Sequence, residues 1–326
     1  MPPRTANCWI EFPVVARGCA DLLGVYDLVI MGDTTFGFQK TYELVPDAPQ
    51  AMPWDEYERA SVAEYQALMA DPGREDEALI HSFLERNPAF IPGAFSYPRS
   101  GHAPIHCGVF SKPRLSGEPG YIPDFLWLAT ATDQMYPIFV EIETPAKRWF
   151  TASGQPTAQW TQAYDQILNW KRWLKNPAQM QTWINSLNLP HPYNRGYEFH
   201  PQFVLIYGSA AEFEERPELR SKRREMAQAD TFLMTFDHLR PDANAGDFMT
   251  LRRDGRRVIA VTVPPTYRLR PLVPEDILEV QGRIEAIQQD ARFSEERRRF
   301  LVERIPYWDT WLRKDKRGTI ISSDFE

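Results

Sequence analysis

Three carboxylates are spaced so that a β-sheet could bring them together. Asp124 begins one apolar run, and Glu141 and Glu143 lie near the end of the next one. Alternate residues of a strand point to the same face, so Glu141 and Glu143 share a face, and Asp124 can lie beside Glu141 in a hairpin. Carboxylates brought together repel one another unless a cation joins them. The pattern therefore predicts a site for a hard divalent cation, Mg²⁺ or Mn²⁺.

The apolar neighbours of these glutamates sharpen that expectation. Ile138, Val140 and Ile142 alternate with them and are expected to face the core. Two acids in such a strand are costly unless a metal, a basic partner or solvent compensates them. A metal there would activate water and neutralise a phosphodiester transition state. Two simpler interpretations remain open: Asp124 as a turn or cap residue after Pro123, and the glutamates on the wet face of an edge strand.

The elements that must position these acids alternate between helix-like and strand-like patterns. Turn signals from Thr130 to Gln134 predict a hairpin between the two acidic runs. A loop rich in Gly, Pro and His is expected before the hairpin, up to Gly120. The expected elements are a helix within 75–88 that Pro88 ends, strands at 122–129 and 137–142, a helix at 158–174, a strand at 203–207, a helix at 212–229 and a strand at 231–236. This order predicts an α/β fold with a mixed central sheet flanked by helices.

The chain divides into three expected regions without an internal repeat. Residues 1–70 form a small β-rich N-terminal element, with apolar runs at 8–15 and 25–31 and a helix at 54–69. Residues 71–250 form the core that carries the acids. Residues 251–326 form a C-terminal extension, with a hairpin around Asp254–Gly255, a proline-rich linker and helices at 275–291 and 294–304.

The charge balance bears on the partner. The net charge is −7, whereas a nucleic-acid binder is expected to be basic. Basic residues nevertheless gather late in the chain, where they could face phosphates. Interleaved acids favour a solvated helix face just as strongly. The basic residues concerned are Arg252, Arg253, Arg256, Arg257, Arg297, Arg298, Arg299, Arg313, Lys314, Lys316 and Arg317.

Several other classes of protein find no support in the sequence. The cysteines number three and lack CxxC spacing, which fits a reducing cytoplasm better than a disulfide scaffold or a zinc ribbon. We expect no signal peptide, because no long apolar run follows a basic start at the N-terminus. We expect no membrane partner, because no run approaches the roughly 20 apolar residues of a membrane span. We also expect no nucleotide cofactor and no serine-hydrolase or zincin chemistry, because GxxxxGK[ST], GxSxG and HExxH motifs do not occur.

At the acidic residues the chain resembles a known group of nucleases. IPDF followed by FVEIETP is similar to the PD-(D/E)xK signature. More narrowly, FLERNP, PDFLW and VEIETP, followed by an amphipathic helix with Gln166 and Trp170, resemble the nuclease domain of the Shedu family of prokaryotic anti-phage proteins. The later FVLIYGS and LMTFDHL segments extend the resemblance to about residues 75–245.

The resemblance implies a fold, an activity and a set of site residues. The fold would be restriction-endonuclease-like, and the activity would be Mg²⁺-dependent (or Mn²⁺-dependent) hydrolysis of DNA by a homo-oligomer, a dimer or tetramer. Asp124 and Glu141 match the metal-binding acids, and Gln166 matches the helix glutamine near the site. Glu77 is the candidate for an additional acid on the first helix, with Glu85 as its competitor.

One departure from the family pattern matters. Glu143 stands where the lysine of ExK is expected, which makes this an ExE variant. Glu143 would then serve as a metal ligand or general base, and Lys147 would supply the missing positive charge. The substitution leaves two hypotheses open: an active nuclease with altered chemistry, or a catalytically degraded fold that acts as a nucleic-acid sensor or scaffold. A metal-free glycosidase with paired carboxylates ranks last, because its acids must flank a sugar cleft.

Overall fold

The computed structural model describes residues 42–71, 75–96, 100–101, 103–115, 120–189, 197–269, 275–314 and 326. The expected β-rich runs at 8–15 and 25–31 lie outside the described residues, as do the lysine and arginine at 316 and 317.

Nine strands of the described residues form one mixed sheet. They are β1 (Ala103–Ser111), β2 (Phe125–Ala131), β3 (Gln134–Ile142), β4 (Glu198–Phe199), β5 (Gln202–Ile206), β6 (Thr231–Met234), β7 (Met249–Asp254), β8 (Arg257–Thr262) and β9 (Val280–Gln281). Their order is β6-β5-β3-β2-β1-β7-β8-β9, and β4 pairs with β3. The β1–β2, β2–β3 and β7–β8 pairs are antiparallel, and the other pairs are parallel.

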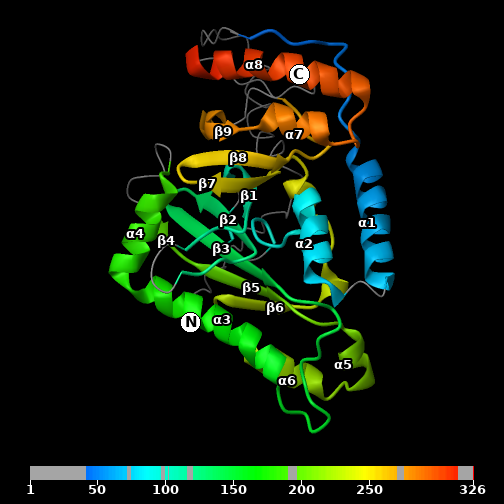
Figure 1. The fold of residues 1–326 in the computed structure, drawn as a ribbon, viewed down its shortest axis with the longest axis vertical. Helices are drawn as coiled ribbons and strands as arrows, with labels where there is room; N and C mark the ends of the chain where they lie inside the picture. Colours follow the sequence, from blue (N-terminus) through cyan, green and yellow to red (C-terminus); the bar gives the residue numbers. More distant parts are fainter. Residues whose placement is uncertain are drawn as a thin grey trace, which may run out of the picture.

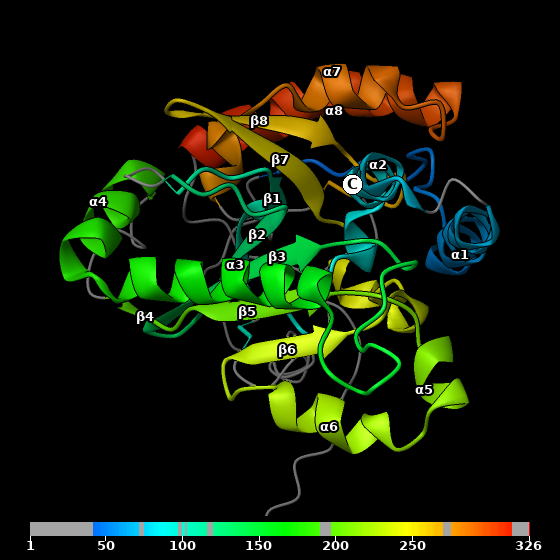
Figure 2. The same ribbon diagram turned by 60° about the horizontal axis from the view of Figure 1, so that its bottom comes forward.

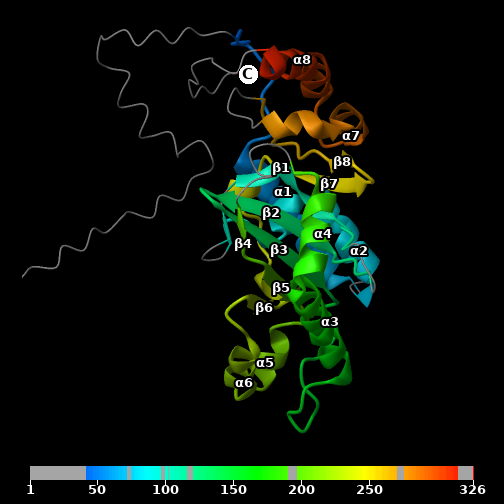
Figure 3. The same ribbon diagram turned by 90° about the vertical axis from the view of Figure 1, so that its left-hand side faces the viewer.

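Helices pack on both faces of this sheet and at its ends. They are α1 (Trp54–Ala70), α2 (Glu77–Arg86), α3 (Ala158–Lys175), α4 (Pro177–Leu187), α5 (Ala211–Glu215), α6 (Leu219–Met226), α7 (Arg283–Gln289) and α8 (Glu295–Lys314). Figure 1 shows α7 and α8 beyond β8 and β9, and Figure 3 shows α5 and α6 at the opposite end of the molecule. No helix among the described residues is both long and apolar enough for a membrane crossing.

Alternation along the strands separates two apolar cores. Leu126 and Phe139 point to the side where α3 and α4 pack, and that core continues to α7 and α8. Trp127 and Val140 point to the opposite side, where α1 and α2 pack. In Figure 2, α3 runs across the strands β3 and β5. Glu141 falls in the same series as Phe139, so it points to the α3 side of the sheet.

Most elements that surround the acids confirm the sequence predictions. The β2–β3 hairpin turns tightly after Ala131, and α3 occupies the expected helix. Ile138, Val140 and Ile142 are buried, as expected of strand residues that face the core. The β7–β8 hairpin also forms, and because β7 pairs with β1, it extends the central sheet. The expected boundary between residues 250 and 251 falls inside β7.

The loop expected up to Gly120 was wrong in its first part, where β1 forms. Two features hid this strand from pattern reasoning. Its pairing with β2 shifts register between Pro104 and Val109, so apolar residues do not alternate. His106 and Cys107 also have positive φ values, of 60° and 52°, which marks an irregular backbone that propensity does not predict.

Three helical expectations also need correction. The helix expected at 212–229 is two short helices, because Arg216 precedes Pro217 and is held out of the helical region. The helix expected at 275–291 is a 3₁₀ turn, the short strand β9 and α7, separated at Gly282, whose φ is positive. Leu79 is 48% exposed, because the inward face of α2 passes through Ile80, Phe83 and Leu84.

Candidate active site

The β2–β3 hairpin places Asp124 and Glu141 side by side. Phe125 pairs with Val140 in the antiparallel ladder, so Asp124 and Glu141 are the next opposing residues. Asp124 Oδ2 accepts a hydrogen bond of 2.8 Å from the backbone N–H of Ile142, which fixes the carboxylate against β3. Both carboxylates are buried. The hairpin register thus produces the expected juxtaposition of two acids from consecutive strands.

Glu141 has one satisfied oxygen and one unsatisfied oxygen. Its Oε1 accepts a hydrogen bond of 2.6 Å from Nε2 of Gln166 on α3. Its Oε2 is buried and has no hydrogen-bond partner among the described residues. Burial raises the pKa of Glu141 well above its ordinary value, and repulsion from Asp124 raises it further. A hydrogen bond to Asp124, which only the protonated carboxyl can donate, and repulsion from Glu143 act in the same direction. An unpaired buried carboxylate oxygen is costly, so this geometry favours a ligand there.

Two lysines pair with the neighbouring acids. The Lys147 ammonium pairs with Oε2 of Glu143, as the chain turns back after Pro145. The Lys112 ammonium pairs with Oδ1 of Asp124, and the Lys112 backbone N–H donates to the Asp124 carbonyl oxygen at 2.8 Å. The site therefore holds positive charge close to each of these two carboxylates.

Lys112 was missed in the sequence. It follows directly after β1, a strand that was expected to be a loop, and it has a φ of 47°. Burial alone would lower the pKa of Lys112, but the Asp124 carboxylate raises it to a net increase. Recognition of β1 as a partner strand of β2 would have predicted Lys112 at the site, because Lys112 is a basic residue directly after that strand.

Glu77 approaches the same acids from the first turn of α2. Burial raises its pKa, and the carboxylates of Asp124 and Glu143 raise it further, which places Glu77 within their electrostatic reach. Its competitor Glu85 lies two turns further along α2. Glu85 hydrogen-bonds the hydroxyl of Ser111 and pairs with an arginine of β7, so it links α2 to the sheet.

His81 is a second residue that sequence reasoning missed. It lies one turn after Glu77 on α2, is buried, and stacks on the ring of Phe125 at 4.6 Å between centroids. Burial and the nearby Lys112 lower its pKa, which favours the neutral imidazole. Its Nε2 has no hydrogen-bond partner within the part of the chain that the structure describes. A lone histidine on a helix carries no spacing signal in the sequence.

The late basic residues are only partly a surface feature. Arg297 is buried and pairs with Glu326, so it is neither a solvated face nor a phosphate contact. Arg253 donates to two backbone carbonyl oxygens at the end of α4. Arg252 pairs with Glu85. These contacts assign three of the basic residues to structural roles that charge counting alone did not reveal.

The donor set suits a hard cation at two carboxylates. Across the described ranges, no three His, Cys, Asp or Glu side chains are grouped so as to hold a metal ion. Glu143 is paired with Lys147, and Asp124 is paired with Lys112, so a cation would have to replace an ammonium group at either acid. Asp124 and Glu141 are adjacent, and Oε2 of Glu141 has no hydrogen-bond partner in the described part of the chain. Mg²⁺ commonly binds one or two carboxylates and completes its shell with waters and substrate phosphates, so two adjacent acids fit it.

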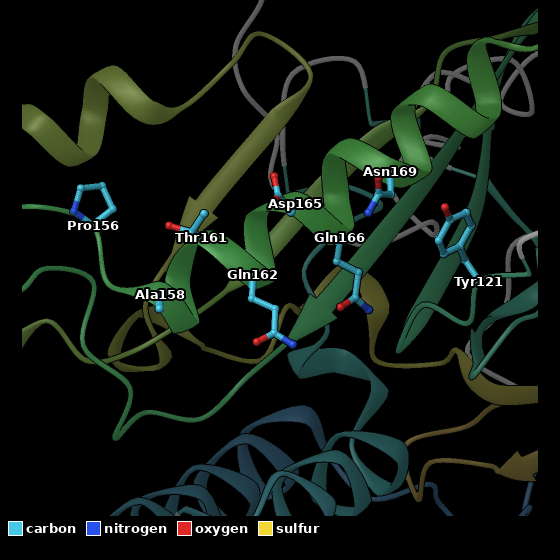
Figure 4. A pocket seen from close by; sticks show the side chains of 8 residues that line it. All are labelled: Tyr121, Pro156, Ala158, Thr161, Gln162, Asp165, Gln166 and Asn169. Atoms are coloured by element: carbon cyan, nitrogen blue, oxygen red, sulfur yellow. The ribbon is translucent and has the colours of Figure 1, made fainter.

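An open, solvent-facing cavity of about 820 Å³ runs along α3 beside this site. Gln166, which hydrogen-bonds Glu141, also lines the cavity. Figure 4 shows Gln162 and Gln166 pointing from the same side of α3, with the Tyr121 ring further along the helix. Asp124, Glu141 and Glu143 do not line the cavity, so Gln166 is the described residue that links it to the acidic site.

One family of known proteins matches the part of the chain that carries the acids. The model of a family described as "Shedu protein SduA, C-terminal" matches residues 74–239. The matched segment contains α2, the β2–β3 hairpin, α3, β5 and β6, and thus every acid of the site. No curated protein matches the chain.

Proposed function

The chain belongs to the Shedu family, and we propose that it is a metal-dependent endonuclease that hydrolyses DNA phosphodiester bonds in anti-phage defence. One observation carries the proposal: two buried carboxylates, Asp124 and Glu141, lie side by side, and one oxygen of Glu141 has no partner among the residues that the structure describes. Asp124 and Glu141 would hold Mg²⁺ or Mn²⁺. A cation bound there supplies an activated water and charge neutralisation at the phosphate.

The remaining residues take roles that follow from their positions. Glu143, the more exposed acid, accepts a proton from the attacking water or serves as a further ligand. The water oxygen forms a bond to phosphorus, and the bond from phosphorus to the leaving sugar oxygen breaks. Lys147 and Lys112 stabilise the negative charge that grows on the phosphate oxygens. Gln166 orients Glu141, and Glu77 adds negative charge at the rim of the site.

Lysines in this arrangement compensate for the altered motif. The ExK pattern places an ammonium group on the strand itself, whereas here Lys147 reaches Glu143 from the turn beyond the strand. Lys112 approaches Asp124 from the neighbouring strand β1. Positive charge is thus available on two sides of the acids, which supports an active site over a degraded one.

A catalytically inactive nucleic-acid sensor is the second candidate. The missing ExK lysine motivates it, together with the raised pKa of Glu141, which favours the neutral carboxyl in the absence of a cation. In this case the protein would bind DNA without cutting it. The net charge of −7 limits nonspecific binding to DNA under either hypothesis.

Cleavage of linear and circular DNA distinguishes the two candidates. Wild type and Glu141→Ala are compared in Mg²⁺, Mn²⁺ and EDTA, and DNA binding is measured in parallel. The nuclease proposal expects cleavage that needs the metal and disappears in the variant. Equal DNA binding by two inert proteins under all three conditions would support the sensor.

A further inference from the structure

The cavity along α3 has a lining that is suited to a nucleobase. Gln162, Gln166 and Asn169 all line it, and their spacing of four and three residues places them on one face of the helix. Carboxamides both donate and accept hydrogen bonds. Tyr121 adds an aromatic ring to the lining (Figure 4). Amide edges and an aromatic face are the two features by which proteins bind unpaired bases.

The same lining is poorly suited to a phosphate. None of the described residues that line the cavity is a lysine or an arginine, and Asp165 contributes a negative charge. A phosphate placed there would be repelled and would lack a charged partner. The lysines of the site, Lys112 and Lys147, lie instead at the carboxylates. The lysines therefore mark a position for the phosphate, and the cavity beside them is polar and has no positively charged lining residue among the described residues.

Gln166 connects these two places. Its Nε2 donates to Glu141 Oε1, and the same side chain lines the cavity. A base in the cavity would therefore lie one side chain away from the carboxylate that faces the scissile phosphate. Building on the proposed function, we propose that the cavity receives an unpaired nucleobase of the cut DNA strand, next to the scissile phosphate.

This assignment predicts the form of the substrate. A paired base is stacked between its neighbours and its hydrogen-bonding edge is occupied, so it must leave the duplex before it can enter the cavity. Bases in gaps and frayed ends are already free and avoid that cost. The protein is therefore expected to prefer DNA with unpaired nucleotides to a fully paired duplex of the same sequence.

Binding in EDTA tests the preference without cleavage. The probes are a fully paired 30-base-pair duplex and the same duplex with a three-nucleotide gap opposite an intact strand that carries 2-aminopurine. Wild type is expected to bind the gapped DNA about tenfold more tightly, because stacking of one base on an aromatic ring increases affinity by about this factor. The 2-aminopurine fluorescence is expected to change on binding.

Variants of the lining residues test whether the cavity causes the preference for gapped DNA. The double variant Gln162→Ala/Asn169→Ala is expected to lose most of the tenfold preference. Gln159→Ala removes an exposed amide of the same helix outside the cavity and is expected to keep it. Tyr121→Leu is expected to weaken binding of the gap, whereas Tyr121→Phe keeps the ring and the preference. Melting curves show whether the partly buried Tyr121 variants remain folded.

The outcomes separate this proposal from the nuclease proposal. Equal affinity of wild type for the two DNAs would overturn the cavity assignment, as would a double variant that behaves like Gln159→Ala. Absence of DNA binding in both EDTA and Ca²⁺ would also overturn it. If the protein prefers gapped DNA but cuts no DNA, the cavity assignment is supported and the nuclease proposal is rejected. If the protein cuts DNA but binds the two DNAs equally, the nuclease proposal is supported and the cavity assignment is rejected.

Discussion

Nε2 of Gln166 lies 2.6 Å from Oε1 of Glu141, so the amide of α3 satisfies one oxygen of this carboxylate. The other oxygen is buried and has no hydrogen-bond partner within the described ranges. The hydrogen bond holds Glu141 in one orientation and leaves Oε2 available to a ligand. Helix α3 thus positions the acid on β3, and the same helix forms the adjoining cavity.

Removal of this amide is expected to impair the site. Gln166→Ala leaves Oε1 of Glu141 without its donor, so the carboxylate loses its fixed orientation. We expect the rate of DNA cleavage to fall about tenfold or more, measured as nicking of a supercoiled plasmid at saturating Mg²⁺. Gln159→Ala on the exposed side of α3 is the matched control. Equal rates for the two variants would show that the hydrogen bond does not position Glu141.

The two lysines are expected to contribute separately to cleavage. Lys112 pairs with Asp124 and Lys147 pairs with Glu143, so each places a cation near one carboxylate. Lys112→Ala and Lys147→Ala should each lower kcat about 100-fold, the scale found for loss of one group that stabilises transition-state charge. Lys175→Ala, at the exposed end of α3, should cut at the wild-type rate. A lysine variant with wild-type kcat would remove that lysine from the mechanism.

The pH dependence of stability is expected to show that ionised Glu141 destabilises the folded protein without metal. In the folded protein without metal, burial raises the pKa of Glu141 above its value in the unfolded chain. Between those two pKa values the folded state holds the extra proton, so the free energy of unfolding falls as pH rises and levels off above the folded pKa. Glu141→Gln removes this proton uptake. In EDTA, the variant should melt at a higher temperature than wild type at pH 8, and the difference should shrink towards pH 4. A lower melting temperature for the variant at pH 8 would contradict the cause assigned to the shift.

Asn87 is expected to stabilise the helix that carries Glu77. Its Oδ1 accepts hydrogen bonds from the Tyr57 hydroxyl at 3.2 Å and from Arg292 Nη1 at 2.9 Å, which joins α1 and the C-terminal region to the end of α2. Asn87→Ala leaves these buried or half-buried donors without their acceptor, at a cost of about 1–3 kcal/mol in the free energy of unfolding. Urea denaturation measures this cost.

The matched control for Asn87 is Arg59→Ala, which removes an exposed ion pair on α1. Exposed pairs contribute about 1 kcal/mol or less, so this variant should unfold close to wild type. If Asn87→Ala were no less stable than Arg59→Ala, the network would not hold α2 in place.

The hairpin and its acids were predictable because local signals agreed with the global fold. Turn residues between two apolar runs fixed the register, and the register placed Asp124 beside Glu141. The position of Gln166 came from the resemblance, since a polar residue on a half-buried helix has no distinguishing pattern of its own. Lys147 was expected to swing back from the turn, and its pairing with Glu143 shows that it reaches the acids.

Other parts of the site depend on long-range packing that no local pattern encodes. Lys112 reaches Asp124 only because the irregular strand β1 pairs with β2. His81 reaches the site because α2 lies over Phe125. The cavity needs Tyr121 to be brought close to α3. The contacts of His81 and Tyr121 join segments that are distant in sequence, and the contact of Lys112 depends on an irregular strand. Single-residue propensities carry no information about either kind of contact.

Plasmid nicking in Mg²⁺ by wild type and Glu141→Gln, side by side, tests whether these carboxylates form a nuclease site. The variant has the shape of the wild-type side chain and keeps an acceptor for Gln166, so a loss of activity reports the missing negative charge and not unfolding. We predict that wild type nicks the plasmid only when Mg²⁺ or Mn²⁺ is present and that the variant is inert while it still binds DNA. Cleavage by Glu141→Gln at the wild-type rate, or wild-type cleavage that persists in EDTA, would contradict the assignment of Asp124 and Glu141 as the metal-binding acids.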